Sequence, residues 1–234
     1  MHPEWPLILR ALLMLHIGCG AIAFVCAPVA LVTAKGGKTH RRWGKIYFWA
    51  MAGVASTALI LSIVLPILFL ALVAVFSFYA AFSAYRILSL KDLNRGGKAN
   101  RVDWAAAGIT FLSSAALAGI GIFRPQLVPG RGIIAVVFGA LGMMIAGRSI
   151  RTFLNPPLEK QFWWYLHMSG MIGSYIGAVT AFTVVNLGHW FGNAWWVWLG
   201  PAMVGVPGIQ IWVRYYKAKF RGRDKAVGEA VAGI

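Results

Sequence analysis

The sequence predicts an all-α bundle of about seven transmembrane helices, and three observations support this fold class. Hydrophobic residues make up 59% of the 234-residue chain and charged residues only 12%, about half the charged share of an ordinary soluble domain. The apolar residues form long runs without an amphipathic period, and the runs suit helices of about 20 residues that face lipid. The runs fill nearly the whole chain. We therefore expect one integral membrane domain, residues 1–234, whose last part, residues 214–234, is a basic cytoplasmic tail.

The spans follow one another with short polar connections. The first has no basic start and no small-residue cleavage site, so we expect a retained span and not a signal peptide. A basic loop, residues 35–45, should lead into the second span. The next apolar run, 46–88, is too long for one crossing, and Pro66 is expected to divide it. The expected spans are residues 7–33, 46–65, 67–88, 102–122, 133–150, 162–185 and 195–213.

Basic residues predict the orientation of the bundle. Of the 22 lysine and arginine residues, 19 fall in the tail and in the loops after the first, third and fifth spans. Only Arg10, Arg124 and Arg131 fall on the other side. The positive-inside rule therefore predicts an N-terminus outside and a C-terminus inside. This bias also accounts for the formal net charge of +16, and no basic stretch has the length and interleaved aromatics of a nucleic-acid groove, so no nucleic-acid partner is expected.

Acidic residues are rare and lie away from the expected centre of the membrane. All six fall in loops, tails or the edges of spans, whereas ion-coupled transporters usually carry such groups at mid-membrane. The two cysteines, Cys19 and Cys26, are expected to lie about 10 Å apart along one helix, which is too far for a disulfide. The composition thus disfavours coupled transport and redox pairing of the cysteines.

Four histidines are the candidate cofactor-binding residues. His16 and His167 lie inside expected spans, His40 lies in the basic loop and His189 lies in the later loop GHWFG. An ionisable group in a membrane is costly and often functional, although a histidine can also only hydrogen-bond a neighbouring helix. By topology, His40 and His167 lie toward the inner face, and His16 and His189 toward the outer face. Haem b takes two imidazoles at one depth, so two such pairs would form a transmembrane electron path.

Two further groups of residues are candidates for binding. Cations beside His40 could bind lipid phosphates or haem propionates, or they could only set the orientation. These cations are Arg41, Arg42 and Lys45. Small residues at helical spacing in the sixth span could pack against a membrane-protein partner or a second copy of the chain. This small-residue ridge consists of Ser169, Gly173, Gly177 and Ala181.

Two stretches carry resemblances to known families. The segment LH-x3-G beginning at Leu15 and the turn GGKTHRRWGKIY resemble the prokaryotic multi-pass membrane family labelled domain of unknown function 2306. The matching turn residues are His40, Arg41, Gly44, Lys45 and Tyr47, and a later match comprises His167, Met171, Ser174 and Tyr175. That label implies no activity. The first stretch also distantly resembles two-haem b-type transmembrane cytochromes, a resemblance that implies haem and electron transfer.

Three functions remain open on the sequence. The first is a haem-binding protein that passes electrons across a bacterial inner membrane. The second is a non-enzymatic structural or accessory subunit of a larger membrane complex, favoured by the small-residue ridge and the 11 tryptophans. The third is a small-solute transporter, which the missing interior carboxylates and the missing repeats disfavour.

Overall fold

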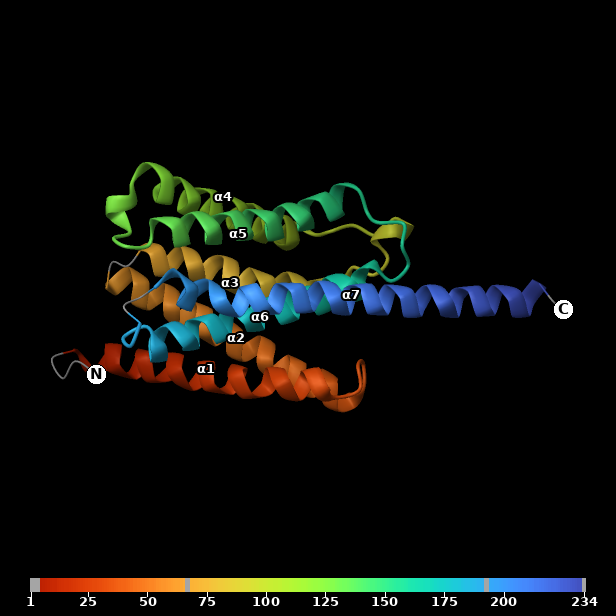
Figure 1. The fold of residues 1–234 in the computed structure, drawn as a ribbon, viewed down its shortest axis with the longest axis horizontal. Helices are drawn as coiled ribbons and strands as arrows, with labels where there is room; N and C mark the ends of the chain where they lie inside the picture. Colours follow the sequence, from red (N-terminus) through yellow and green to blue (C-terminus); the bar gives the residue numbers. More distant parts are fainter. Residues whose placement is uncertain (1–4, 66–67, 192–193, 233–234) are drawn as a thin grey trace.

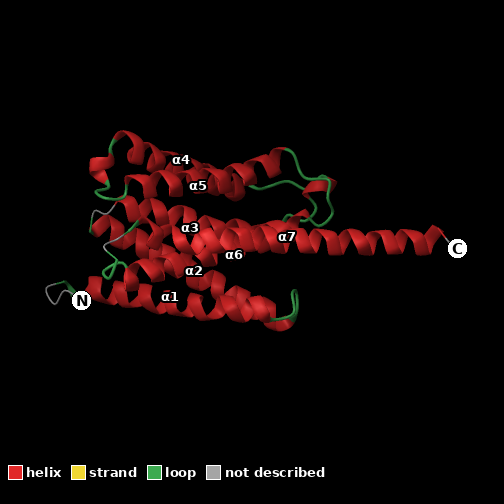
Figure 2. Cartoon of the chain, viewed as in Figure 1, coloured by secondary structure: helices red, strands yellow, loops and turns green. Residues whose placement is uncertain are grey.

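The computed structural model describes residues 5–65, 68–191 and 194–232, and within these the chain is an all-α bundle without strands. Seven of the described helices are long and apolar enough to cross a membrane, which confirms the predicted fold class. They are α1 (Leu7–Val32), α2 (Lys38–Val64), α3 (Leu68–Arg86), α4 (Arg101–Phe123), α5 (Gly132–Leu154), α6 (Phe162–Leu187) and α7 (Trp195–Ala232). Short 3-10 turns lie between α3 and α4 and between α4 and α5, and no strand accompanies the helices in Figure 2.

The helices form layers, and their axes lie roughly along one common line through the molecule (Figure 1). The α4–α5 hairpin lies along one side and α1 along the other, with the remaining helices between them (Figure 1). The two termini lie at opposite ends, as an odd number of crossings requires. The end at which α1, α3 and α5 finish is called the basic end below, because most of the lysines and arginines lie on the connections there, on the adjoining helix ends and on the extension of α7. At this end α7 extends well beyond the other helices (Figure 1).

Two helices extend beyond the spans expected from hydropathy. The basic loop is much shorter than expected, because α2 begins at Lys38. Gly36, with φ of 78°, supplies the left-handed residue of the turn, and Gly37 precedes the helix. The basic tail is helical as far as Ala232, because α7 continues without interruption to that residue. The turn expected at Pro66 lies outside the described residues.

Aromatic packing explains why α7 continues as a helix beyond the expected span. The ring centre of Trp164 on α6 lies 4.4 Å from that of Tyr216 and 5.5 Å from that of Phe220. Such ring pairs contribute roughly 0.5–1.5 kcal/mol beyond the area they bury. Hydropathy falls along this segment as lysines and arginines appear, and this fall suggested an end to the span. The helix itself is supported by its contacts with α6.

Glycine and alanine let pairs of helices approach closely. A Cβ added at Gly139 of α5 would lie 2.5 Å from the backbone oxygen of Ser114 and 2.6 Å from the backbone nitrogen of Ala118, both on α4. A Cβ at Gly170 of α6 would lie 2.6 Å from the Cβ of Ala84 on α3. Helices in lipid associate through close packing of small residues, because lipid offers no hydrophobic driving force. The Gly170–Ala84 contact holds α6 against the last turns of α3.

A buried ion pair joins α3 to α4 at the basic end. Arg86 donates from Nε to Oδ1 of Asp103 over 2.8 Å and from Nη2 to Oδ2 over 3.0 Å. Asp103 also belongs to a capping box, in which the backbone nitrogens of Asn100 and Asp103 are bonded by the opposite side chains. The carboxylate is almost completely buried. Sequence analysis placed these residues only in a loop and at the edge of a span.

A candidate two-histidine site

His40 lies in the first turn of α2 and bonds back to the end of α1. Its Nδ1 lies 2.9 Å from the backbone oxygen of Ala30. Because a carbonyl can only accept, Nδ1 carries the hydrogen, and a neutral ring then keeps its lone pair on Nε2. The Ala30 carbonyl belongs to the last turn of α1, where carbonyls have no partner within the helix. Nζ of Lys35 donates to the same Ala30 oxygen and also to the backbone oxygen of Leu31.

His167 lies in the second turn of α6 and bonds to α3 in the same manner. Its Nδ1 lies 2.8 Å from the backbone oxygen of Ala84. This carbonyl also fixes the hydrogen on Nδ1 and leaves the lone pair on Nε2. The bond is possible because Gly170, one turn further along α6, allows the two helices to touch. A neutral His167 therefore offers a single ligating nitrogen in a ring of fixed orientation.

The structure brings His40 and His167 together. Their ring centres are 6.3 Å apart and their planes are inclined by 80°. The two side chains come from α2 and α6, and their backbone acceptors come from α1 and α3. Four helices thus meet at the basic end around two imidazoles. Metal-binding histidines usually donate their other ring hydrogen to a carbonyl or a carboxylate, which fixes the tautomer and orients the ring.

About two turns beyond the two histidines, a hydrogen bond joins α2 to α6. The hydroxyl of Tyr47 lies 2.6 Å from Oγ of Ser174, which donates to the backbone oxygen of Met171 over 2.9 Å. Sequence analysis placed Tyr47 and Ser174 in two resembling motifs but did not predict that they are bonded. Lys91, on the connection after α3, is close enough to His167 to interact with it electrostatically. Its Nζ lies 4.2 Å from the ring centre of Trp163.

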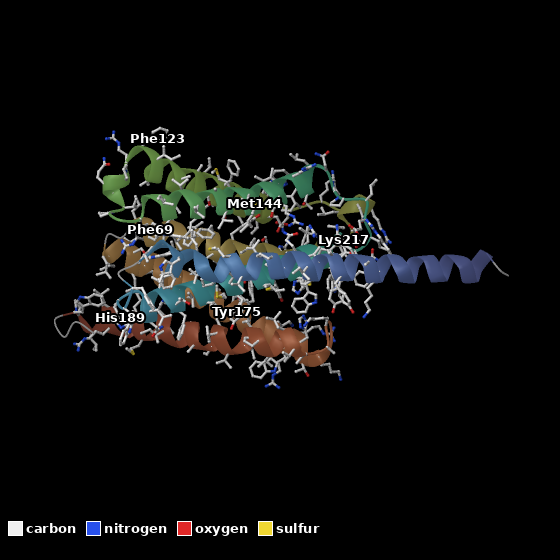
Figure 3. All side chains as sticks on the ribbon, in the orientation of Figure 1. Phe69, Phe123, Met144, Tyr175, His189 and Lys217 are labelled. Atoms are coloured by element: carbon white, nitrogen blue, oxygen red, sulfur yellow. The ribbon has the colours of Figure 1, made fainter. Side chains whose placement is uncertain are left out.

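The expected outer pair has different surroundings. Nδ1 of His16 lies 2.9 Å from Oγ1 of Thr57 and 3.2 Å from the backbone oxygen of Val54, so His16 links α1 to α2. His189 is exposed on the connection between α6 and α7, and its ring centre lies 5.3 Å from that of Trp190. Figure 3 shows His189 at the end of the bundle opposite Lys217. His16 therefore has a structural partner, and His189 lies at the surface.

The other candidate residues lie on helix surfaces. Arg41, Arg42 and Lys45 are exposed on the first turns of α2, close in sequence to His40. In the small-residue ridge, a Cβ added at Gly173 would meet no atom within 4 Å, and one at Gly177 would lie 4.0 Å from Oγ of Ser77. Ser169 is partly buried and Ala181 is exposed. Gly170, next to the ridge, makes the close contact with α3, so part of the ridge remains free for another helix.

No set of three or more histidine, cysteine, aspartate or glutamate side chains within the described segments is placed to hold a metal ion. The histidine pair therefore offers two protein ligands. Comparisons of the chain with protein-family models, with curated proteins and with solved structures found no match in any of the three. The chemistry of the site follows from its residues alone.

Proposed function

We propose that this integral membrane protein binds haem b through His40 and His167 and transfers electrons at the basic end of the bundle. The observation that carries the proposal is the pair of imidazoles, 6.3 Å apart, each with its Nδ1 hydrogen donated to a backbone carbonyl. Both neutral rings then present Nε2, the nitrogen that can bind a metal. Haem iron with two axial imidazoles is a one-electron carrier.

The ring separation agrees with one metal held between two imidazoles. With metal–nitrogen bonds of about 2.0 Å and a ring centre roughly 1 Å behind each nitrogen, two opposed imidazoles have centres about 6 Å apart. The observed separation is 6.3 Å. Perpendicular ring planes are compatible with this arrangement, because rotation about each metal–nitrogen bond leaves the bond intact. If the two rings were instead hydrogen-bonded to each other, one Nε2 would have to carry a hydrogen. Two neutral rings could not then both donate from Nδ1 to backbone carbonyls.

The number of protein ligands favours haem over a bare ion. Structural zinc takes four protein ligands and catalytic zinc three, whereas this pair supplies two. A porphyrin brings four nitrogens of its own and needs protein ligands only above and below the ring. Exposed Arg41, Arg42 and Lys45 on α2 are suitable partners for its two carboxylates.

The proposal includes an orientation and a location. The positive-inside rule assigns the basic end to the cytoplasm, and with it the histidine pair. A bacterial inner membrane is the location that suits such a multi-pass protein. Since His16 bonds to α2 and His189 is exposed, the proposal includes one haem at the inner face and no second haem at the outer face.

The test is the visible spectrum of the protein purified from haem-sufficient cells. We expect a Soret band that shifts on reduction, with one haem per chain by pyridine haemochrome assay. His40→Ala and His167→Ala should each lose most of the band, while the matched surface variant His189→Ala should keep it. A colourless preparation would overturn the proposal, as would a band that survives both inner substitutions. A band lost in His16→Ala but kept in His167→Ala would move the site to the outer face.

The second candidate is an accessory subunit of a larger membrane complex or a homo-oligomer. The observation in its favour is the free part of the small-residue ridge, where Gly173 has no neighbour within 4 Å of an added Cβ. Small residues on a lipid-facing helix allow another helix to approach. Gentle solubilisation should then recover a larger particle, which Gly173→Leu disrupts and Ala181→Leu weakens. Recovery of the native chain as a monomer in several mild detergents would contradict this candidate.

A further inference from the structure

A pocket of about 170 Å³ lies at the basic end, and neither histidine of the pair lines it. It is lined by α5, by the connection from α5 to α6, and by α6 and α7. Its charged residues are Arg148, Glu159 and Lys217, and its apolar wall includes Phe162, Leu166 and Val213. Figure 3 shows Lys217 at the end of the bundle opposite His189. The pocket thus combines cations with an apolar wall at the basic end of the bundle.

The charges in this pocket do not cancel. Nζ of Lys217 lies 3.4 Å from Oε2 of Glu159, so the single carboxylate already has a partner. Arg148 forms no hydrogen bond or ion pair through its guanidinium with any residue that the structure describes. The contrast is with Arg86 on α3, which is matched by the buried carboxylate of Asp103. One positive charge in the wall of the pocket is therefore uncompensated.

The position of Arg148 raises the cost of an uncompensated charge. It lies six residues before the end of α5, about 9 Å inside the helix terminus by helical rise. A charge at this depth is expensive unless it reaches the interface or meets an anion. Long side chains can reach the interface by extending along the helix. Arg148 is exposed on the surface of α5 and shares a pocket with Lys217, a second cation, from α7. Basic pockets between transmembrane helices bind acidic headgroups.

We propose that this pocket binds the phosphate group of an anionic phospholipid. The guanidinium of Arg148 supplies a planar fork that matches two phosphate oxygens, and Lys217 supplies a second positive charge. The acyl chains would leave along the apolar wall formed by Leu166 and Val213, toward the membrane. A free phosphate ion could use the same cations but not the apolar wall, so the pocket favours the lipid. The site is independent of the histidine pair and of any haem.

The experiment counts lipids that stay bound to the whole chain. The protein is placed in nanodiscs of phosphatidylglycerol and phosphatidylcholine, released gently, and weighed by native mass spectrometry. We expect one phosphatidylglycerol to be retained selectively by the native chain. Arg148→Gln should weaken this retention by about tenfold or more, since an ionic hydrogen bond of the usual strength is lost. The matched control is Arg151→Gln, one turn further on α5 and outside the pocket lining, which should retain the lipid.

A second variant acts in the opposite direction. Glu159→Gln removes the carboxylate that pairs with Lys217, frees this cation, and should strengthen phosphatidylglycerol retention severalfold. Equal losses in Arg148→Gln and Arg151→Gln would overturn the proposal, and so would weaker retention in Glu159→Gln. The source of the phosphate is tested by adding inorganic phosphate to the protein in the mixed phosphatidylglycerol and phosphatidylcholine nanodiscs. If free phosphate competes with the lipid at similar concentrations, the assignment to a phospholipid is wrong. The proposal requires that phosphate fails to compete.

Discussion

Replacing Asp103 with asparagine should destabilise the bundle by about 2–3 kcal/mol. Removing one partner of a buried ion pair usually costs about 3–5 kcal/mol, because the other charge remains without compensation. Here the Asp103 side chain is 1% exposed but that of Arg86 is 28% exposed. Arg86 can therefore regain some hydration, and the cost should fall somewhat below this range. Asparagine can still accept from the backbone nitrogen of Asn100, so most of the capping box survives. The loss therefore reports mainly on the ion pair.

The assay is reversible unfolding in mixed micelles, followed by circular dichroism as denaturing detergent is added. The chain contains a matched control in the ion pair of Arg95 with Asp92. Its atoms are 3.9 Å apart, and its side chains are 66% and 77% exposed. Exposed pairs contribute about 0–1 kcal/mol. We therefore expect Asp92→Asn to change the free energy of unfolding by less than about 0.5 kcal/mol.

A double-mutant cycle identifies the source of the loss. If the pair acts as the geometry indicates, Arg86→Gln and Asp103→Asn are strongly coupled, and the double variant is much less destabilised than the sum of the single variants. Equal effects of Asp103→Asn and Asp92→Asn would refute the reasoning. A coupling energy near zero between the two positions would refute it as well, because it would assign the loss to helix capping alone.

Three other predictions concern packing, hydrogen bonding and pH. Gly139→Ala should destabilise the bundle by about 1–3 kcal/mol, because the new Cβ would clash with the backbone of α4. Gly173→Ala should be neutral or slightly stabilising in monomeric protein. Thermal unfolding compares the two variants. Tyr47→Phe should cost about 0.5–1.5 kcal/mol through loss of the bond to Ser174, and equal stability of native and variant proteins would contradict this. Burial lowers the pKa of Lys35 below its ordinary value of 10.5, so the folded chain holds this proton less tightly than the unfolded chain. Stability should therefore rise as pH increases from the lowered pKa toward 10.5, and Lys35→Met should remove this rise.

Hydropathy and charge were sufficient for the spans and for the histidine pair. Each helix is an apolar run of sufficient length, and His40 and His167 were expected at one depth because both lie near the same ends of their spans. Their separation of 6.3 Å could not be predicted. It depends on the contact of Gly170 with Ala84 and on the tight turn at Gly36, which are properties of packing and of backbone conformation.

The extensions of α2 and α7 beyond the expected spans share one cause. Hydropathy detects the membrane and does not detect the helix, so a helix that continues into water is read as a loop. The basic first turns of α2 and the long extension of α7 are both of this kind. The pair of Arg86 with Asp103 was missed for a different reason. The spacing of Asn100 and Asp103 fits a capping box, but nothing in the sequence shows that the end of α3 meets the start of α4.

His40 permits a test that separates a structural role from a ligand role. Like His16 and His167, it donates from Nδ1 to a backbone carbonyl, so this bond alone does not indicate a cofactor. What distinguishes His40 is the second imidazole beside it. In His40→Asn the amide nitrogen occupies the place of Nδ1 along the side chain and can still donate to Ala30, but the ligating Nε2 is gone.

We expect His40→Asn to keep nearly native stability and to lose the haem spectrum, while His40→Ala should lose both the spectrum and about 0.5–1.5 kcal/mol of stability. If His40 only caps the last turn of α1 through its bond to Ala30, His40→Asn should be indistinguishable from the native chain in every measurement. Because the asparagine preserves the bond to α1, a spectral loss in this variant cannot be attributed to the cap. The substitution therefore assigns the lost signal to Nε2 of His40 and, through the 6.3 Å separation, to the pair it forms with His167.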